Sequence, residues 1–148
     1  MYLIQDIETI PQTEISDSWS GDFPPIWAHR VITIGMLALD KNLHPIKGGC
    51  ASGGCASGAT EAQMIARWSQ AASGELFGQK EPLQLVDWCG RTFDMPVLQT
   101  RAFRHGIPLP WYFGSPEGRW AKAYRDRYGG MHLDLAESWT NHGAFPRP

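Results

Sequence analysis

The sequence predicts an α/β fold in which helices pack on a mixed β-sheet. Two observations support this prediction. Apolar, β-branched runs of strand length dominate the start of the chain, and later strand-like runs alternate with segments whose apolar residues recur with helical spacing. The chain has 148 residues, 43% of them hydrophobic, which suits one hydrophobic core. We therefore expect a single domain spanning residues 1–148.

Five segments have the composition of strands. The first begins at the N-terminus and is followed by a loop rich in Ser, Asp, Gly and Pro (residues 11–25). The second is long and apolar, and the short turn Asp40-Lys41-Asn42 after it can only join antiparallel neighbours. The predicted strands are Tyr2–Glu8, Arg30–Leu39, Leu43–Ile46, Leu83–Val86 and Met131–Leu135.

Three segments have helical spacing. The first, Thr60–Trp68, places Met64, Ile65 and Trp68 on one face and has a capping threonine at its start. The others are Phe93–His105, which Gly106 would end, and Ala136–Asn141. The resulting order, three strands followed by helix, strand, helix, strand, helix, resembles the ribonuclease H-like mixed sheet. In that sheet the first strand is central, so its outward side chains would face a cleft.

Two acidic side chains lie on that first strand. Because successive side chains of a strand alternate faces, Asp6 and Glu8 share one face roughly 7 Å apart. Two like charges this close disfavour folding unless a cation, a proton or basic side chains neutralise them. Asp94 lies at the start of the second helix, after the fourth strand, where an acid is expected to join the pair; the alternative interpretation is that it caps the helix.

These residues belong to two longer motifs that resemble those of a known enzyme family. Asp6-Ile7-Glu8-Thr9 and Gly90-x-x-Phe93-Asp94-x-Pro96-x-Leu98 resemble the first two motifs of the DEDD 3′-5′ exonucleases. Further similarity points to one branch, the predicted 3′-5′ exonucleases related to the exonuclease domain of family B DNA polymerases. The residues that carry it are His29-Arg30-Val31, Arg101, Gly106, Arg127-Tyr128 and His132-Leu133-Asp134-Leu135.

The resemblance implies a specific chemistry. Asp6, Glu8 and Asp94 would hold two Mg²⁺ or Mn²⁺ ions, because these hard cations prefer carboxylate oxygens, and the ions would promote hydrolysis of phosphodiester bonds. The substrate would be the 3′ end of single-stranded DNA or another nucleic acid. The residues implied in substrate binding are Thr9, Ile10, Phe93 and Arg101.

One expected motif is missing. The family completes its site with Tyr-x-x-x-Asp on a late helix, and the only match here is Tyr2 to Asp6, which belongs to the first motif. We therefore expect a chain that is truncated relative to the family and lacks the C-terminal helices. His132, Glu137 and Asp134 are the candidates for a substitute ligand, although Asp134 also suits a helix cap.

This departure keeps two alternatives open. The chain could be a catalytically impaired module that still binds nucleic acid, or a module that binds a partner. In the second case the face left by the missing helices would be covered by another subunit, such as a second copy of the chain.

The two parts of the chain differ in the sign of their net charge. Residues 1–90 carry five basic and ten acidic side chains, a net charge of −5, whereas residues 91–148 carry eight and five, a net charge of +3. The densest basic cluster is interleaved with aromatic residues, a composition that suits phosphates and stacked bases, but taken alone a solvated helix face is the favoured interpretation. The cluster consists of Arg119, Lys122, Arg125 and Arg127 with Trp120, Tyr124 and Tyr128.

The other aromatic residues divide into two groups by sequence context. Trp68 and Trp88 adjoin predicted elements and are expected in the core. Trp111, Tyr112 and Trp120 lie in a polar stretch with Gly and Pro, and they are the better candidates for substrate contact.

A tandem repeat interrupts the chain between the third strand and the first helix. Gly48-Gly49-Cys50-Ala51-Ser52 is repeated at residues 53–57, and its glycine content predicts a flexible loop. Its two cysteines could join Cys89 in a thiolate site, but the spacing fits no zinc pattern, and free surface thiols are the favoured interpretation.

The remaining sequence features favour a cytoplasmic protein. The longest apolar runs, Val31–Leu39 and Leu83–Val86, are far shorter than the ~20 residues of a membrane-spanning helix. Three cysteines form no disulfide framework, and the first strand leaves no room for a signal peptide. We expect no membrane association.

Overall fold

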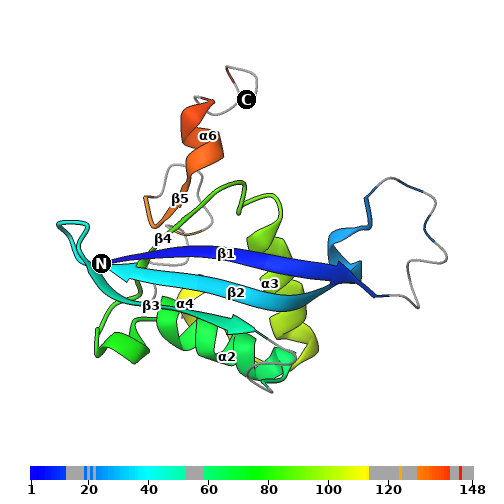
Figure 1. Ribbon diagram of the computed structural model, residues 1–148, viewed down its shortest axis with the longest axis horizontal. Helices are drawn as coiled ribbons and strands as arrows, with labels where there is room; N and C mark the ends of the chain where they lie inside the picture. The colour runs from blue at the N-terminus through cyan, green and yellow to red at the C-terminus, as the bar shows by residue number, and fades with distance from the viewer. Residues whose placement is uncertain are drawn as a thin grey trace.

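A mixed five-stranded sheet forms the centre of the molecule in the computed structural model, which describes residues 1–12, 19, 21, 23–52, 59–113, 124, 130–140 and 144 (Figure 1). The strands are β1 (Tyr2–Pro11), β2 (His29–Leu39), β3 (Pro45–Ser52), β4 (Gln84–Asp87) and β5 (His132–Asp134). The helices are α2 (Glu61–Ala72), α3 (Asp94–Arg104), α4 (Pro110–Phe113) and α6 (Leu135–Trp139), with 3-10 turns η1 (Ile26–Ala28) and η2 (Glu75–Phe77). The predicted α/β class is confirmed.

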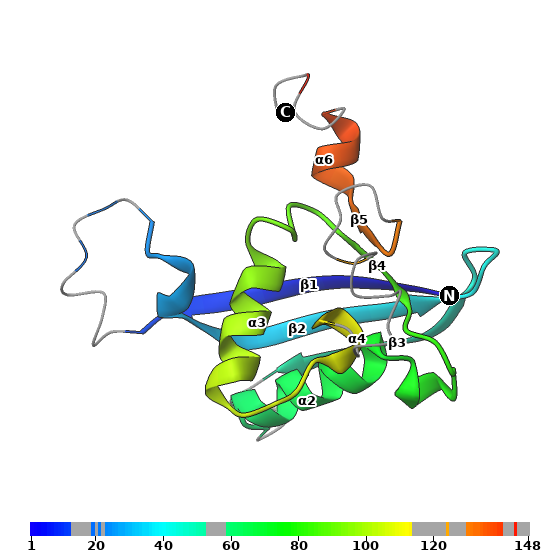
Figure 2. The ribbon, with the colours of Figure 1, turned by 180° about the vertical axis from the view of Figure 1, so that it is seen from behind.

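The strand order is β3-β2-β1-β4-β5, so β1 is central as expected. β2 pairs antiparallel with both β1 and β3, whereas β4 runs parallel to β1 and β5. β4 pairs with β1 only at Tyr2, Leu3 and Ile4. The second half of β1 is therefore left without a strand on that side, and α3, which follows β4 in the chain, crosses the face of the sheet formed by β1 and β2 (Figure 2).

The third strand is longer than the sequence predicted. Leu43 has a φ of 65° and belongs to the turn, and pairing with β2 begins at Pro45 and continues to Ser52. The first copy of the glycine repeat is therefore strand, not loop, because ladder hydrogen bonds use only the backbone. Gly48 also has little room for a side chain: a Cβ there would lie 3.1 Å from Leu37 Cδ1. The second copy of the repeat lies outside the described residues.

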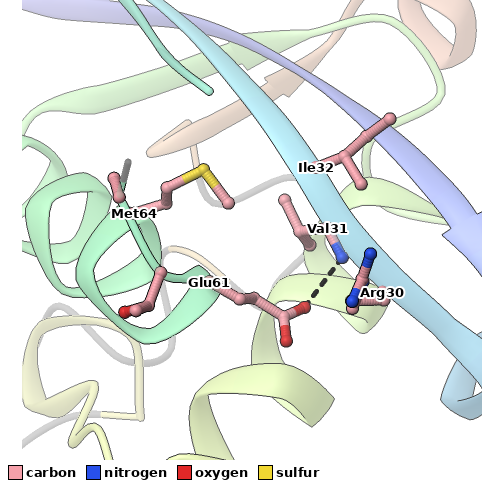
Figure 3. A pocket seen from close by; sticks show the side chains of 7 residues that line it. Arg30, Val31, Ile32, Glu61 and Met64 are labelled. Carbon is pink, nitrogen blue, oxygen red and sulfur yellow. Dashed lines mark hydrogen bonds between the residues drawn. The ribbon is translucent and has the colours of Figure 1, made fainter. Parts of the chain in front are cut away.

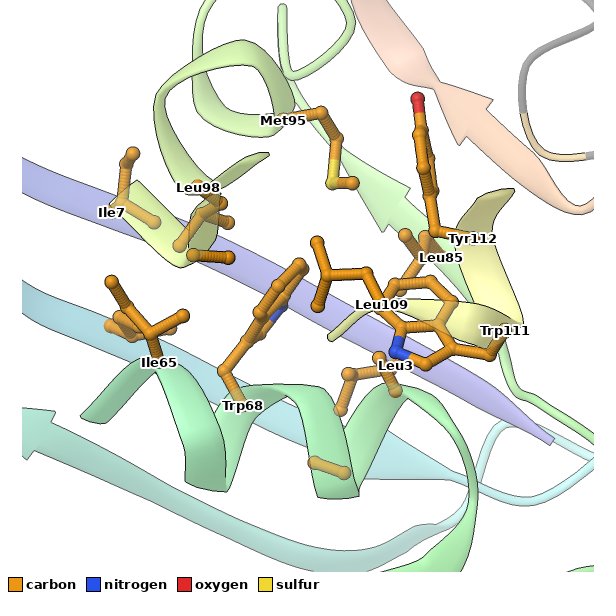
Figure 4. Close-up of a cluster of buried hydrophobic side chains, with 14 of the residues drawn as sticks. Leu3, Ile7, Ile65, Trp68, Leu85, Met95, Leu98, Leu109, Trp111 and Tyr112 are labelled. Carbon is orange, nitrogen blue, oxygen red and sulfur yellow. The ribbon is translucent and has the colours of Figure 1, made fainter. Parts of the chain in front are cut away.

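Helix α2 begins where the sequence predicted, through a capping box. Thr60 Oγ1 accepts a hydrogen bond from Gln63 N–H, and Gln63 Oε1 accepts one from Thr60 N–H. The helix then presents Met64, Ile65 and Trp68 to the sheet, each at most 1% exposed. They join the hydrophobic core between the helices and the sheet, where Ile65 and Trp68 lie near Leu3 and Leu98 (Figure 4).

The structure corrects four expectations about aromatic residues. Trp88, expected in the core, is 51% exposed because it follows the end of β4. Trp111 and Tyr112, expected at the substrate, are 7% exposed and pack in the core with Trp68, which is buried as predicted. Tyr124 is fully buried, and its hydroxyl donates to Leu83 O, so it cannot stack on a base. Burial raises the pKa of Tyr124.

Helices α2, α3 and α4 lie on the same side of the sheet in both views of the ribbon (Figures 1 and 2). Side chains of β1 that point to them are buried, among them Leu3, Gln5 and Ile7, while the alternate ones are exposed. Helix α3 ends at Arg104, and Gly106, two residues later, has a φ of 65° that suits glycine. In the described part of the chain no helix is long and apolar enough to cross a membrane.

Candidate active site

The face of β1 that points away from the helices carries the two acids of the first motif. Asp6 and Glu8 are both exposed, whereas Gln5, before Asp6, and Ile7, between the two acids, are buried. The two acids therefore share a face, as the sequence predicted. The residue opposite Asp6 on β2 is Gly35, and a Cβ at this position would lie 3.7 Å from Asp6 O. The absence of a side chain at Gly35 leaves space beside the Asp6 carboxylate.

A β-bulge lies next to Glu8. The pairing of β1 with β2 shifts between Glu8, which lies opposite Thr33, and Thr9, which lies opposite Val31, so that Ile32 is the extra residue. Bulges bend a strand locally and re-aim the side chains beside them. Val31 lies beside the bulge, and its N–H donates a hydrogen bond of 2.7 Å to Oε1 of Glu61, the first residue of α2. The structure thus fixes the backbone beside the first motif with a buried carboxylate.

Asp94, the acid of the second motif, begins α3 and is 5% exposed. Its pKa is raised to about 7, first by burial and then by the negative charges of Asp87, Asp6, Asp134 and Glu8, in that order. Its Oδ2 is buried and has no hydrogen-bond partner. Asp94 therefore lies within electrostatic range of both acids on β1, with one carboxyl oxygen unsatisfied.

Asp87, at the end of β4, is the acid with the largest effect on Asp94, and the sequence analysis missed it. It is 3% exposed, and its Oδ2 accepts from Gln5 Nε2 at 3.1 Å and from His132 Nε2 at 2.7 Å. Gly90 of the second motif lies against this carboxylate: a Cβ there would be 2.1 Å from Asp87 Cγ. The position of Asp87 directly after a buried strand was the available sequence signal.

The candidates for a substitute ligand all have structural partners. His132 is 3% exposed on β5 and bonds Asp87. Asp134 caps α6 by accepting from Ala136 and Glu137 N–H, and it also accepts from two N–H groups that follow β4, those of Cys89 and Arg91. Glu137 lies 3.4 Å from Arg91 Nε. These contacts tie β5 and α6 to the loop that carries the second motif.

Arg101 does not occupy the expected place at the substrate. It is 3% exposed, and its guanidinium forms a bidentate ion pair with Glu61, with Nε 2.8 Å from Glu61 Oε1. His105 Nε2 lies 2.8 Å from the same carboxylate. Because a buried and paired guanidinium is not available to a phosphate, the assignment of Arg101 to substrate binding is corrected to a structural role.

Glu61 therefore organises the side of the sheet next to α2. Its burial opposes ionisation, but hydrogen bonds from Arg101, His105 and Val31 N–H outweigh that cost and lower the pKa of the carboxyl group. A pocket of about 260 Å³ adjoins it, lined by residues of β2 and the start of α2 (Figure 3). The lining residues are Arg30, Val31, Ile32, Ala59, Thr60, Glu61 and Met64.

The remaining predicted substrate residues lie at the C-terminal end of β1 and at the start of α3. Thr9 is half-buried, and its hydroxyl lies 2.9 Å from His29 Nδ1. Ile10 is 38% exposed. Phe93 precedes Asp94, and its ring lies edge-on to the His29 ring with centroids 5.1 Å apart. The structure thus brings Thr9 and Phe93 to the same histidine.

The donor set fits hard divalent cations in kind. Asp6, Glu8 and Asp94 offer carboxylate oxygens, one of them the unsatisfied Oδ2 of Asp94, and such oxygens are the ligands that Mg²⁺ and Mn²⁺ prefer. Across the part of the chain that the structure describes, no group of three His, Cys, Asp or Glu side chains is placed to hold a metal ion. The mutual repulsion of these acids opposes a closer approach without a cation.

The sequence matches one known protein family over most of its length. Residues 21–147 match the family described as predicted 3′-5′ exonucleases related to the exonuclease domain of PolB. The chain belongs to this family. The family match begins after β1, so Asp6 and Glu8 lie outside the matched range, while Asp94 and the second motif lie within it. No curated protein matches the sequence.

Solved structures show the same fold as this family member. E. coli exonuclease I in complex with a dT13 oligonucleotide has a TM-score of 0.52 and 14% identity, covering 97% of this chain and 29% of the other. The zinc-bound form of the E. coli exonuclease I complex with single-stranded DNA gives the same values. Exonuclease I without ligand has a TM-score of 0.52 and 14% identity, with 97% and 30% coverage. The chain thus spans less than a third of these proteins.

Some predicted features lie outside the described residues. They are the basic cluster at Arg119, Lys122, Arg125 and Arg127, the aromatic residues Trp120 and Tyr128, and Cys55. The interpretations of these residues as a nucleic-acid surface and as free thiols stay predictions.

Proposed function

We propose that this chain is a metal-dependent 3′-5′ exonuclease that hydrolyses phosphodiester bonds at the ends of single-stranded DNA. The observation that carries the proposal is the buried Asp94 of the second motif, whose Oδ2 has no hydrogen-bond partner, together with Asp6 and Glu8 on one exposed face of β1. Family membership supports the reaction class. The finer features, the metal ions and the single-stranded substrate, follow from the chemistry of the carboxylates and from the resemblance.

The residues divide the work as follows. Asp6, Glu8 and Asp94 would hold two Mg²⁺ or Mn²⁺ ions, which when bound activate water and stabilise the leaving oxygen. Thr9, Ile10 and Phe93, at the end of β1 and the start of α3, would contact the terminal nucleotide. Gly35 leaves room beside Asp6 for a ligand. Glu61 holds the bulge that follows Glu8 in register.

Hydrolysis of a labelled single-stranded oligonucleotide with Mn²⁺ tests the proposal. The wild-type protein should shorten it stepwise from the 3′ end, and Asp6→Ala should lower the rate by at least about a hundredfold, since one metal-holding carboxylate is lost. Asp40→Ala is the matched control, because Asp40 lies in the turn between β2 and β3 and should leave the rate unchanged. Wild-type protein without Mn²⁺-dependent cleavage, or cleavage by Asp6→Ala at the wild-type rate, would contradict it.

One observation favours an alternative function. Within the described residues no three side chains are placed to hold a metal, and the three candidates for a substitute ligand are all engaged in structural contacts. A module that binds nucleic acid or a partner without hydrolysing it would have these properties. If the wild-type protein binds the oligonucleotide without cleaving it, a nucleic-acid-binding module is supported. If it neither binds nor cleaves the oligonucleotide, a partner-binding module is supported.

A further inference from the structure

Three aromatic rings meet at the far end of β1. The ring centroid of Phe23 lies 5.1 Å from that of His29 and 5.7 Å from that of Phe93, and the His29 and Phe93 centroids are 5.1 Å apart. We call these three residues the aromatic cluster. Its members come from three separate places in the chain: the segment before η1, the start of β2 and the residue before α3.

The inner part of the aromatic cluster is fixed by hydrogen bonds. His29 is 3% exposed, its Nε2 lies 3.1 Å from Pro24 O, and its Nδ1 lies 2.9 Å from Thr9 Oγ1. Because a carbonyl oxygen only accepts, Nε2–H donates to Pro24, while Nδ1 is paired with the Thr9 hydroxyl. Both ring nitrogens are thus occupied, so His29 acts as a rigid support for the two phenyl rings and not as a metal ligand.

The outer ring is open to solvent. Phe23 is 61% exposed, although it packs on two other rings. The aromatic cluster also adjoins both acidic motifs, since Thr9 follows Glu8 and Phe93 precedes Asp94. An exposed ring that is supported from behind and adjoins a proposed nuclease site offers a flat surface for stacking.

Basic side chains lie at the same end of the sheet. Arg30 is exposed, follows His29 and is paired with Ile10 across the two strands. Arg104 is exposed and donates to Gln12 Oε1 at 3.0 Å, while Gln12 N–H donates to Ala28 O at 2.8 Å, beside His29. Guanidinium groups at the same end of the sheet as an exposed ring complement the phosphates of a single strand.

We propose that Phe23, supported by His29 and Phe93, is a stacking site for a base of single-stranded DNA near its 3′ end. This inference rests on the proposed function for its location, because the acids beside it would act on the end of the same strand. It adds a contact outside the two acidic motifs, contributed by the segment that joins β1 to η1.

The test measures binding and not hydrolysis. A fluorescently labelled oligo-dT is titrated with protein in Ca²⁺ buffer, and fluorescence anisotropy gives the Kd. Phe23→Ala should raise the Kd about tenfold, which is the loss of one base–aromatic stack, while Phe23→Trp should keep wild-type affinity. Phe103→Ala is the matched control, because Phe103 is a phenylalanine that is 89% exposed on α3 and should leave the Kd unchanged.

An abasic site, moved in turn through the 3′ part of the oligo-dT, makes the test specific. At one position it should weaken binding to the wild type and have no further effect on Phe23→Ala, because both changes remove the same stack. A wild-type protein that does not bind oligo-dT, a Phe23→Ala protein with wild-type Kd, or two effects that multiply at every position would overturn the inference. If stacking is found but Mn²⁺-dependent cleavage is not, the proposed function fails and the binding site stands.

Discussion

At the residue scale, Gly90 shows why the second motif needs a glycine. An added Cβ would lie 2.1 Å from Asp87 Cγ and Oδ2, and Asp87 is held by Gln5 and His132. A shift of the carboxylate away from the added methyl group would strain the two hydrogen bonds to its Oδ2. We expect Gly90→Ala to lower the free energy of unfolding by about 1–3 kcal/mol through overpacking, measured by urea denaturation.

The matched control for this prediction is Gly35→Ala. Gly35 is also a glycine with ordinary backbone geometry, but a Cβ there would meet nothing closer than Asp6 O at 3.7 Å. Its urea midpoint should remain near that of the wild type. A Gly90→Ala protein as stable as Gly35→Ala would show that the Asp87 carboxylate can shift and that the glycine is not required for packing.

Residues differ in how far their roles can be predicted from sequence. The shared face of Asp6 and Glu8 follows from the period of a strand, and the position of Asp94 at a helix start follows from helical spacing. The role of Arg101 does not, because its partner Glu61 lies 40 positions away on another helix. A charged side chain reads the same in sequence whether it meets solvent or a buried counter-ion.

At the scale of elements, the Glu61 carboxylate connects α2 to β2 and α3. It accepts from Val31 N–H on β2 and from Arg101 on α3, and its pKa is lowered by these contacts despite its burial. Glu61→Gln leaves the guanidinium of Arg101 buried without a counter-charge. We expect it to lower the free energy of unfolding at pH 7 by about 3 kcal/mol, measured by urea denaturation.

The same carboxylate predicts a pH dependence. Because the folded-state pKa of Glu61 lies below its usual 4.5, its stabilising effect is complete above that value and is lost as the pH falls through the folded-state pKa. The stability difference between wild type and Glu61→Gln should therefore shrink below about pH 4.5. Glu75→Gln, at an exposed position in η2, should have the same free energy of unfolding as the wild type both above and below about pH 4.5. A constant difference across this range would contradict the assignment.

Elements were predictable where side-chain periodicity decides them and not where backbone pairing does. Helix α2 begins at its predicted cap because Thr60 and Gln63 satisfy each other locally. β3 continues into the glycine repeat because a neighbouring strand supplies its hydrogen bonds, which glycine-rich sequence does not reveal. The short helix α4 (Pro110–Phe113) went unpredicted, because its buried Trp111 and Tyr112 have no helical period over four residues.

At the scale of the whole molecule, the central place of β1 could be predicted because the succession of strands and helices resembles the ribonuclease H-like sheet, in which the first strand is central. What the succession could not predict is which side chains of distant strands meet. Asp87 on β4 bonds His132 on β5, and Asp134 on β5 accepts from Cys89 and Arg91 after β4. These contacts gather five acids, Asp6, Glu8, Asp87, Asp94 and Asp134, into one region of negative charge.

This gathering of acids predicts that divalent cations stabilise the whole fold. A cation that binds only the folded protein adds RT ln(1 + [M]/Kd) to its stability. Binding is expected here because a cation relieves the repulsion that contributes to the raised pKa of Asp94. In thermal unfolding, Mn²⁺ at a hundredfold excess over its Kd should raise the Tm of the wild type by about 5–10 °C, and EDTA should reverse the rise. NaCl at matched ionic strength should not reproduce it, since exposed charges are only screened by salt.

Asp6→Ala should start with a Tm at or above the metal-free wild type, because one like charge is gone, and should gain much less from Mn²⁺. An equal rise in Asp6→Ala and wild type would place the cation elsewhere on the molecule and remove the support that this cluster of acids gives to a metal-dependent nuclease.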